Sequence, residues 1–271
     1  MKTTRRFGSE RGFVRWHSAS AIAAVLAMFA SAGPSGADVG GAARDGTGAY
    51  AGVFAGSGRT DNRLIDVDGF ADWGNPGATT DYDQRGLVGG VLAGRTFEVS
   101  GTRLRVEIDG TFGDLSARTD KLDPTCTDES AASEFRWVAT ARVGVEEPVG
   151  RATVFATGGL AAARIVNSVT DIDYSGTRCL ERDLRPDPDD SFRGSSTETG
   201  CVIGVGVEAP LSDAWTLRLD GSYLDFGRST HHVNHTGGNP CGPGGPHRPC
   251  RYDIENRLGI VRLAIIRRFG S

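Results

Sequence analysis

Apolar and polar positions alternate with a period of two along residues 135–165, and this alternation predicts two strands joined by a tight turn. Pro148 and Gly150 mark the turn, and the second strand starts at Arg151. A wall with lipid on one side and a polar lumen on the other requires an apolar face opposite a polar one. In the first strand the apolar face is Phe135, Trp137, Ala139, Ala141, Val143 and Val145, and the opposite face is Arg136, Val138, Thr140, Arg142, Gly144 and Glu146.

The same alternation recurs along the chain and predicts eight strands, at about 48–57, 86–97, 103–114, 135–146, 151–165, 196–208, 215–226 and 254–269. The connections between them are alternately long and short. This asymmetry is typical of an all-β, eight-stranded antiparallel up-and-down transmembrane β-barrel, with short periplasmic turns and long extracellular loops. The long loops are expected at about 58–85, 115–134, 166–195 and 227–252.

The first 37 residues have the pattern of a signal peptide, with a basic start, an apolar stretch from Ala19 to Phe29 and small residues around Ala30 and Ala32. A short segment, 38–47, precedes the barrel at 48–269. Residues 1–37 hold five basic residues and one acidic residue, so their removal changes the formal net charge from −4 to −8. An acidic exported chain is a poor candidate for binding nucleic acid.

The strand sequences resemble those of the small eight-stranded outer-membrane β-barrel proteins of Gram-negative bacteria, particularly the 25/31-kilodalton outer-membrane proteins of alphaproteobacteria. The likeness covers every strand and none of the loops. It lies in GAYAGVFAG (48–56), GLVGGVLAGRTF (86–97), VEIDGTFGDLS (106–116), ATARVGV (139–145), VFATGGLAAA (154–163), IGVGVEAPLSDAWTLRLDGSYLDFG (203–227) and VRLAIIRRF (261–269).

This resemblance implies a surface-exposed structural protein of the cell outer membrane, without catalysis and without a cofactor. Its expected partners are outer-membrane lipid and, during insertion, the barrel-assembly machinery, and the barrel is expected to be a monomer. The chain departs from the family pattern in two ways. Gly270 and Ser271 follow the final aromatic residue, Phe269, and the chain has five cysteines where the family usually has none.

Charged side chains on the lumen side of the predicted strands form a candidate network, because isolated charges cannot sit in a dry interior unpaired. One interpretation is a structural plug of ion pairs, and the other is a narrow ion path or porin-like channel. The predicted members are Arg105, Glu107, Asp109, Arg136, Arg142, Arg218, Asp220 and Arg262.

Four cysteines, Cys126, Cys179, Cys241 and Cys250, lie in predicted extracellular loops, where export through an oxidising compartment favours disulfides. Four cysteines allow three pairings, of which 241–250 with 126–179 is one. The fifth, Cys201, shares a strand face with apolar residues, so we expect it to be unpaired and to face lipid.

Histidines gather in the last predicted loop, at positions 231, 232, 235 and 247. A solvated polar loop is the expected interpretation, and no catalytic, metal-binding or cofactor-binding residue is assigned. The alternatives are a haem or metal site, since some members of the resembling family are linked to haemin binding, and a lipid A-modifying enzyme. The enzyme would use His231 or His232 with Ser229 or Asp225, although nothing in their spacing is diagnostic.

Overall fold

The structure is a computed structural model that describes residues 47–68, 76–121, 127–173, 191–233 and 250–269. Within these ranges no helix is long and apolar enough to span a membrane. The regular structure consists of nine strand segments: β1 (Gly48–Asp66), β2 (Thr79–Val99), β3 (Thr102–Gly113), β4 (Leu115–Lys121), β5 (Thr127–Val149), β6 (Ala152–Asp173), β7 (Ser191–Pro210), β8 (Trp215–Val233) and β9 (Cys250–Phe269).

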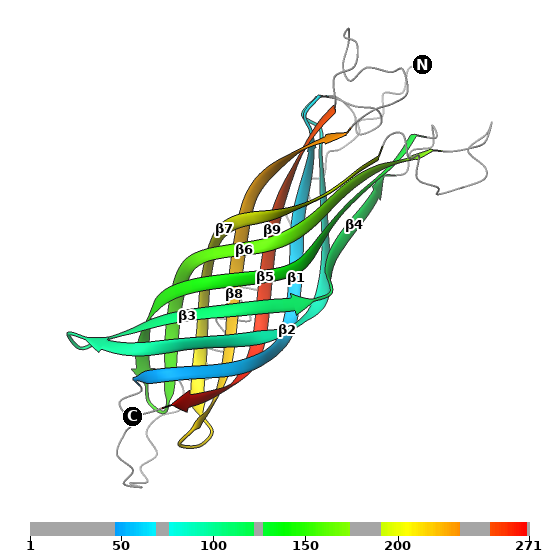
Figure 1. Ribbon diagram of the computed structural model, residues 1–271. Coiled ribbons are helices and arrows are strands. Elements are labelled where there is room, and N and C mark those ends of the chain that lie inside the picture. The colour runs from blue at the N-terminus through cyan, green and yellow to red at the C-terminus, as the bar shows by residue number, and fades with distance from the viewer. Residues whose placement is uncertain (1–46, 69–75, 122–126, 174–190, 234–249, 270–271) are drawn as a thin grey trace, which may run out of the picture. The chain divides into compact units, whose positions relative to one another are not determined.

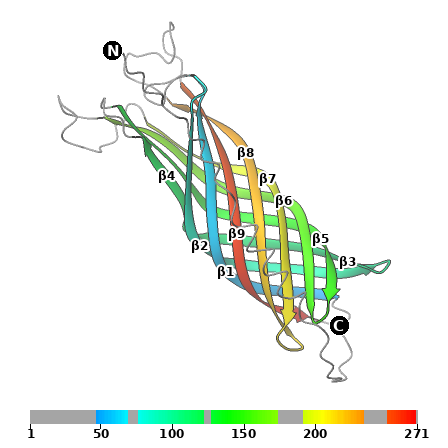
Figure 2. The same ribbon diagram turned by 180° about the vertical axis from the view of Figure 1, so that it is seen from behind.

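The strands form one antiparallel sheet that closes on itself (Figures 1 and 2). Strands that are consecutive in the sequence pair with each other, except β3 with β4, and β1 pairs with β9. The interruption between β3 and β4 at Asp114 does not add a strand to the barrel, because both segments pair with β5. The predicted eight-stranded up-and-down barrel is therefore confirmed. Between the short turns and Asp114 the wall is closed, because β3 pairs with both β2 and β5. Beyond Asp114 no ladder joins β2 to β4 among the described residues.

Three short turns lie at one end of the barrel, here called the turn end, at residues 100–101, 150–151 and 211–214. Ser100 and Gly101 both have positive φ, which suits a two-residue hairpin turn of the primed type. The strand ends that lead to the four other connections lie at the opposite end, here called the far end. The alternation of long and short connections thus agrees with the sequence-based prediction.

The strands are longer than the sequence pattern predicted, and they continue into all four segments that were expected to be loops. For example, β1 runs to Asp66 and β2 starts at Thr79, although 58–85 was expected to be irregular. The reason lies on the outer face, which changes from apolar to charged part of the way along each strand. We call the charged part the extension; its strand residues are 59–66, 79–85, 115–121, 127–136, 164–173, 191–199, 225–233 and 250–257.

Between the turn end and the extension, the outer face is an apolar band. In β3 the outward side chains from Leu104 to Phe112 are apolar, and Ile108 between them is 60% exposed. This stretch is nine residues long, counting both ends, which matches the length of a tilted strand that crosses a bilayer. Near the turn end, Arg267 lies over the rings of Trp215 and Phe269, as in an interfacial aromatic girdle. The outer face of this band is therefore suited to lipid.

In the extension the outer face is polar. The outward side chains of β1 and β2 form ion pairs, Arg59 with Asp83 at 3.0 Å and Arg63 with Asp81 at 2.6 Å. The inward side chains there are buried, and they include polar groups such as Asn62 and Asn256 as well as a cluster of apolar ones. This inner cluster consists of Leu64, Tyr82, Ala117, Ala131, Val169, Tyr252 and Ile254. The period-two pattern persists, but here water lies outside and the core lies inside.

Replacing Ile108 by arginine tests this division of the wall. An arginine on the lipid face near the bilayer midplane is expected to lower the free energy of unfolding by about 2–4 kcal/mol. Val166 also points outward, but from the extension of β6 and opposite Glu134, so Val166→Arg is expected to cost less than about 0.5 kcal/mol. Urea unfolding in lipid vesicles measures both variants, and equal small effects would contradict a lipid-facing band.

Candidate functional site

Seven of the eight predicted lumen charges converge inside the barrel near the turn end. They come from different strands because inward positions recur at every second residue of each one. All seven are buried. They are Arg105, Glu107 and Asp109 on β3, Arg142 on β5, Arg218 and Asp220 on β8, and Arg262 on β9.

Glu107 lies at the centre of this network. Its carboxylate accepts hydrogen bonds from Arg142 at 2.6 Å, from Arg218 at 2.5 Å and from the hydroxyl of Tyr50 at 2.8 Å. Asp109 accepts from Arg142 at 2.7 Å and from Arg262 at 3.0 Å. Each of these carboxylates therefore bridges guanidinium groups from separate strands across the lumen.

Three further charged residues belong to the network and were not among the predicted members: Glu146, Glu208 and Arg268. Arg105 donates to Glu146 at 2.6 Å and to Glu208 at 2.5 Å, and Arg268 also donates to Glu208. Glu146 lies an even number of residues from Arg142 on β5, so the alternation of faces in the sequence marked Glu146 as inward. With these additions five arginines face five carboxylates, so the formal charges cancel.

Aromatic rings support the arginines from the inner wall. The guanidinium group of Arg105 lies 4.0 Å from the centre of the Phe155 ring, and that of Arg262 lies 4.4 Å from the Phe54 ring. Glycines make room for these rings, since a Cβ atom on Gly206 would collide with Phe155 and one on Gly90 would collide with Phe54. Such stacking holds the planar groups in place for bidentate pairing.

Arg136, the eighth predicted member, does not enter the lumen, and its inward assignment was wrong. A β-bulge between Phe135 and Trp137 inserts one residue and reverses the alternation of faces. Phe135 therefore points inward and is buried, whereas it was predicted on the outer face. Arg136 points outward and pairs with Glu134 at 2.9 Å.

An apolar layer lies between the charge network and the far end. Along β9, Arg262 of the network is followed toward the far end by Ile260 and Leu258, and along β5, Arg142 is followed by Val138 and Phe135. None of the layer's side chains is more than 5% exposed. The layer consists of Val88, Leu115, Phe135, Val138, Ala161, Ala163, Ile165, Val202, Leu224, Phe226, Leu258 and Ile260.

Beyond the apolar layer, inside the extension, a chain of hydrogen bonds crosses the barrel. The Ser133 hydroxyl donates to Asn167 Oδ1 at 2.7 Å, so the neighbouring Tyr82 hydroxyl, also at 2.7 Å, donates to Ser133. Asn167 Nδ2 lies 3.1 Å from His231 Nε2. An amide NH₂ can only donate, so Nε2 accepts and the imidazole is neutral with its proton on Nδ1.

Burial favours the uncharged forms of Tyr82 and His231, the two titratable groups in this chain of hydrogen bonds. It raises the pKa of Tyr82 to about 12. It also lowers the pKa of His231, against the weaker opposing effect of the carboxylates of Glu198 and Asp253. The neutral state that the hydrogen bonds require is therefore also the state that desolvation favours.

The proposed enzyme alternative depends on the same histidine. Ser229 Oγ lies 2.9 Å from Nε2 of His231, but this is the atom that already accepts from Asn167. A general base needs that lone pair for the nucleophile's proton. Asp225 accepts from the backbone of Gly227 at 2.8 Å, and His232 is exposed. This arrangement does not have the geometry of a catalytic triad.

The remaining predicted residues lie mostly outside the described ranges. These are Cys126, Cys179, Cys241, His235 and His247, and of Cys250 only the backbone is described. The disulfides therefore stay a prediction. Cys201 is free and exposed on the outer face, as predicted. Among the described residues, no group of three or more histidine, cysteine or acidic side chains could hold a metal ion.

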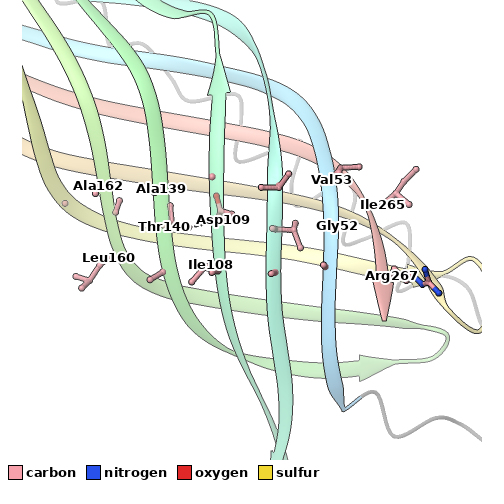
Figure 3. Close-up of a pocket in the computed structure, with 18 of the residues that line it drawn as sticks. Gly52, Val53, Ile108, Asp109, Ala139, Thr140, Leu160, Ala162, Ile265 and Arg267 are labelled. Carbon is pink, nitrogen blue, oxygen red and sulfur yellow. Dashed lines mark hydrogen bonds between the residues drawn. The ribbon is translucent and has the colours of Figure 1, made fainter. Parts of the chain in front are cut away.

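An apolar hollow is lined by residues of the wall, many of them small (Figure 3). Leu160, at 72% exposed, and Ile265 belong to the outward apolar band, whereas Asp109 and Thr140, joined by a hydrogen bond, mark the lumen side of the same strands. The figure thus displays both faces of the wall. The outward part of the hollow is suited to acyl chains.

Comparisons with known proteins agree with this architecture. A family model described as an outer membrane protein beta-barrel domain matches residues 20–240. The 31 kDa outer-membrane immunogenic proteins of Brucella melitensis and Brucella suis are each 27% identical over 191 residues, which is 67% of this chain and 72% of theirs. The crystal structure of the outer membrane protein OprG from Pseudomonas aeruginosa is similar with a TM-score of 0.50 and 13% identity, covering 83% of this chain and 97% of OprG.

Removing one arginine from the charge network is expected to destabilise the barrel strongly. Arg218→Met leaves Glu107 and Glu208 short of a partner in a buried site, so we expect a loss of about 3–5 kcal/mol in the free energy of unfolding. The matched control is Arg59→Met, which breaks an exposed pair and should cost less than about 1 kcal/mol. Urea titration in lipid vesicles compares the two, and similar losses would contradict a tightly coupled network.

His231 is expected to make stability depend on pH. Its folded-state pKa lies below the ordinary value of 6.5, so its contribution is complete above pH 6.5. Below pH 6.5 the imidazole is protonated more readily in the unfolded chain than in the folded one. The free energy of unfolding therefore falls with pH until the folded-state pKa has been passed. His231→Gln should reduce the slope of unfolding free energy between pH 6.5 and 5, whereas His232→Gln should leave it unchanged. An unchanged slope in His231→Gln would show that the buried imidazole does not contribute.

Proposed function

Since the chain belongs to the outer membrane protein beta-barrel domain family and is a protein of the cell outer membrane, we propose that it is a non-catalytic structural barrel with a sealed lumen. Its extension raises the four far-end connections above the bilayer and presents them to the outside of the cell. The turn end then lies on the periplasmic side, as is usual for barrels with short turns at one end.

The observation that carries this proposal is the apolar layer across the lumen. An ion that leaves the charge network toward the far end would have to pass between side chains such as Phe135, Phe226 and Leu258, which are buried and closely packed. The rings of Phe135 and Phe226 have their centres 5.7 Å apart. Moving a charge through such a layer without a polar partner is very costly.

The charge network supports a plug more than a path. Its five arginines are directly paired with its five carboxylates, several of them through two hydrogen bonds. A selectivity site in a channel must bind an ion weakly enough to release it, and usually presents a ring of one sign of charge. A set that is balanced in charge and paired across strands instead ties β3, β5, β8 and β9 together across the lumen.

The relatives support the surface role. The two Brucella proteins are named as immunogenic outer-membrane proteins, and a protein exposed at the cell surface is accessible to an immune system. We infer the same kind of exposure for this chain because its strands continue beyond the apolar band as a water-facing extension. For the alternative of a lipid A-modifying enzyme, His231, Ser229 and Asp225 do not have the geometry of a catalytic triad. For the alternative of a haem or metal binder, the candidate residues His235, His247 and Cys241 lie outside the described ranges.

Single-channel recording in planar bilayers tests the sealed lumen. The wild-type barrel is expected to give no stepwise conductance, whereas Phe135→Ala combined with Phe226→Ala should introduce small, brief openings because it removes two facing rings from the layer. Wild-type steps that disappear in Arg142→Gln would contradict the proposal and support the ion path instead.

A further inference from the structure

Three faces of the extension each carry three outward arginines, but only two of these faces carry an equal number of outward carboxylates. On the β1–β2 face the arginines are Arg59, Arg63 and Arg85, and the carboxylates are Asp61, Asp81 and Asp83. On β8 and β9 they are Arg228, Arg251 and Arg257 with Asp225, Asp253 and Glu255. On β5, β6 and β7, among the residues whose side chains are described, they are Arg136, Arg164 and Arg193 with only Glu134.

The contacts follow this difference in charge. On the β8–β9 face Arg228 pairs with Glu255 at 2.8 Å, and on the β1–β2 face both Arg59 and Arg63 are paired. On the β5–β7 face Arg136 pairs with Glu134 at 2.9 Å, but Arg164 contacts a neutral group, the hydroxyl of Ser195 at 2.6 Å. Arg193 has no ion pair to a described residue. This face therefore carries positive charge that the described part of the protein does not neutralise.

The basic cluster consists of Arg136 and Arg164, and the β-bulge in β5 sets the direction of Arg136. Arg193 lies on the same face but farther toward the far end, opposite Ser168. Without the bulge, Arg136 would follow the alternation of the strand into the lumen. The bulge turns it outward beside Trp137, and Trp137 is the register partner of Arg164. β-bulges commonly re-aim a side chain in this way next to functional sites. Both arginines consequently lie at the upper edge of the apolar band, where lipid headgroups begin.

We propose that the basic cluster on the β5–β7 face binds the phosphate group of a phosphorylated glycolipid from the outer leaflet of the membrane. Arginine presents a planar fork that pairs with phosphate oxygens through two hydrogen bonds. Ser195 and Thr197 lie exposed on the same face of β7 and offer hydroxyl groups to a sugar. The proposal rests on the outer-membrane location and on the far end being extracellular, and it does not require the lumen to be sealed.

The wall below the cluster continues the site into the lipid. Ala139 of β5 and Ala162 of β6 are register partners and both belong to the apolar hollow, with Leu160 next along β6 (Figure 3). Small side chains beside a large one leave a depression that an acyl chain fills. A lipid whose phosphate lies at the arginines would thus have its acyl chains against the apolar band, which already faces lipid.

Binding of lipid A to the purified full-length barrel in detergent tests the proposal. Native mass spectrometry measures occupancy by diphosphorylated lipid A, by its dephosphorylated form and by phosphatidylglycerol. The double variant Arg136→Gln with Arg164→Gln should bind diphosphorylated lipid A at least about tenfold more weakly than the wild type. The control, Arg59→Gln with Arg63→Gln, removes the same charge from a balanced face and should bind as the wild type does.

Three results would overturn the proposal. If both double variants lost the same affinity for diphosphorylated lipid A, the effect would be a non-specific one of net charge. If the wild type bound dephosphorylated lipid A as tightly as the diphosphorylated form, the phosphate would not be recognised, and if it bound phosphatidylglycerol as tightly, the site would be a general phosphate site. The unboiled gel mobility of each variant confirms that it has folded before its binding is measured. A conducting wild-type barrel would contradict the sealed lumen but would leave this binding result unaffected.

Discussion

Each strand of this barrel meets two solvents, and the rest of the structure follows from that constraint. Toward the turn end the outer face meets lipid, so Ile108 and Leu160 point outward there. In the extension it meets water, and Arg59 and Asp83 take the corresponding positions. The backbone is hydrogen-bonded sheet in both parts, and along the apolar band it is closed because lipid tolerates no unpaired edge. Only the side chains change across the boundary.

The interior also changes along the barrel. Behind the apolar band it holds the balanced charge network centred on Glu107 and Arg218. An apolar layer follows, then the hydrogen-bonded chain that includes His231, and then the inner cluster of the extension. Charges buried behind lipid must be paired, and every arginine of this network has a carboxylate partner. The same pairing leaves no row of unpaired charge to guide ions, which connects the stability of the barrel with its proposed lack of conductance.

Much of the fold could be predicted from the sequence because period-two alternation is a local signal. It identified eight strands, their order and the outward set from Leu104 to Phe112. The far ends of the strands were missed because polar stretches such as 58–66 were interpreted as loops, although the charges at Arg59, Asp61 and Arg63 recur there at every second position. Arg136 was misplaced because a single bulge residue reverses parity and leaves no compositional trace. The contact of Arg105 with Glu208 joins residues on non-adjacent strands, and alternation alone does not predict such contacts.

The boundary between the two solvents is most directly tested by spin labels placed one at a time along the outer face of β2, at Val91, Leu87, Arg85, Asp83 and Asp81, in lipid vesicles. The account predicts immobilised, strand-like spectra at all five positions. Relaxation by oxygen should dominate at Val91 and Leu87, and relaxation by a water-soluble nickel complex should dominate from Arg85 onward. Mobile, loop-like spectra from Arg85 to Asp81, or water accessibility at Val91, would contradict a continuous wall that passes from lipid into water.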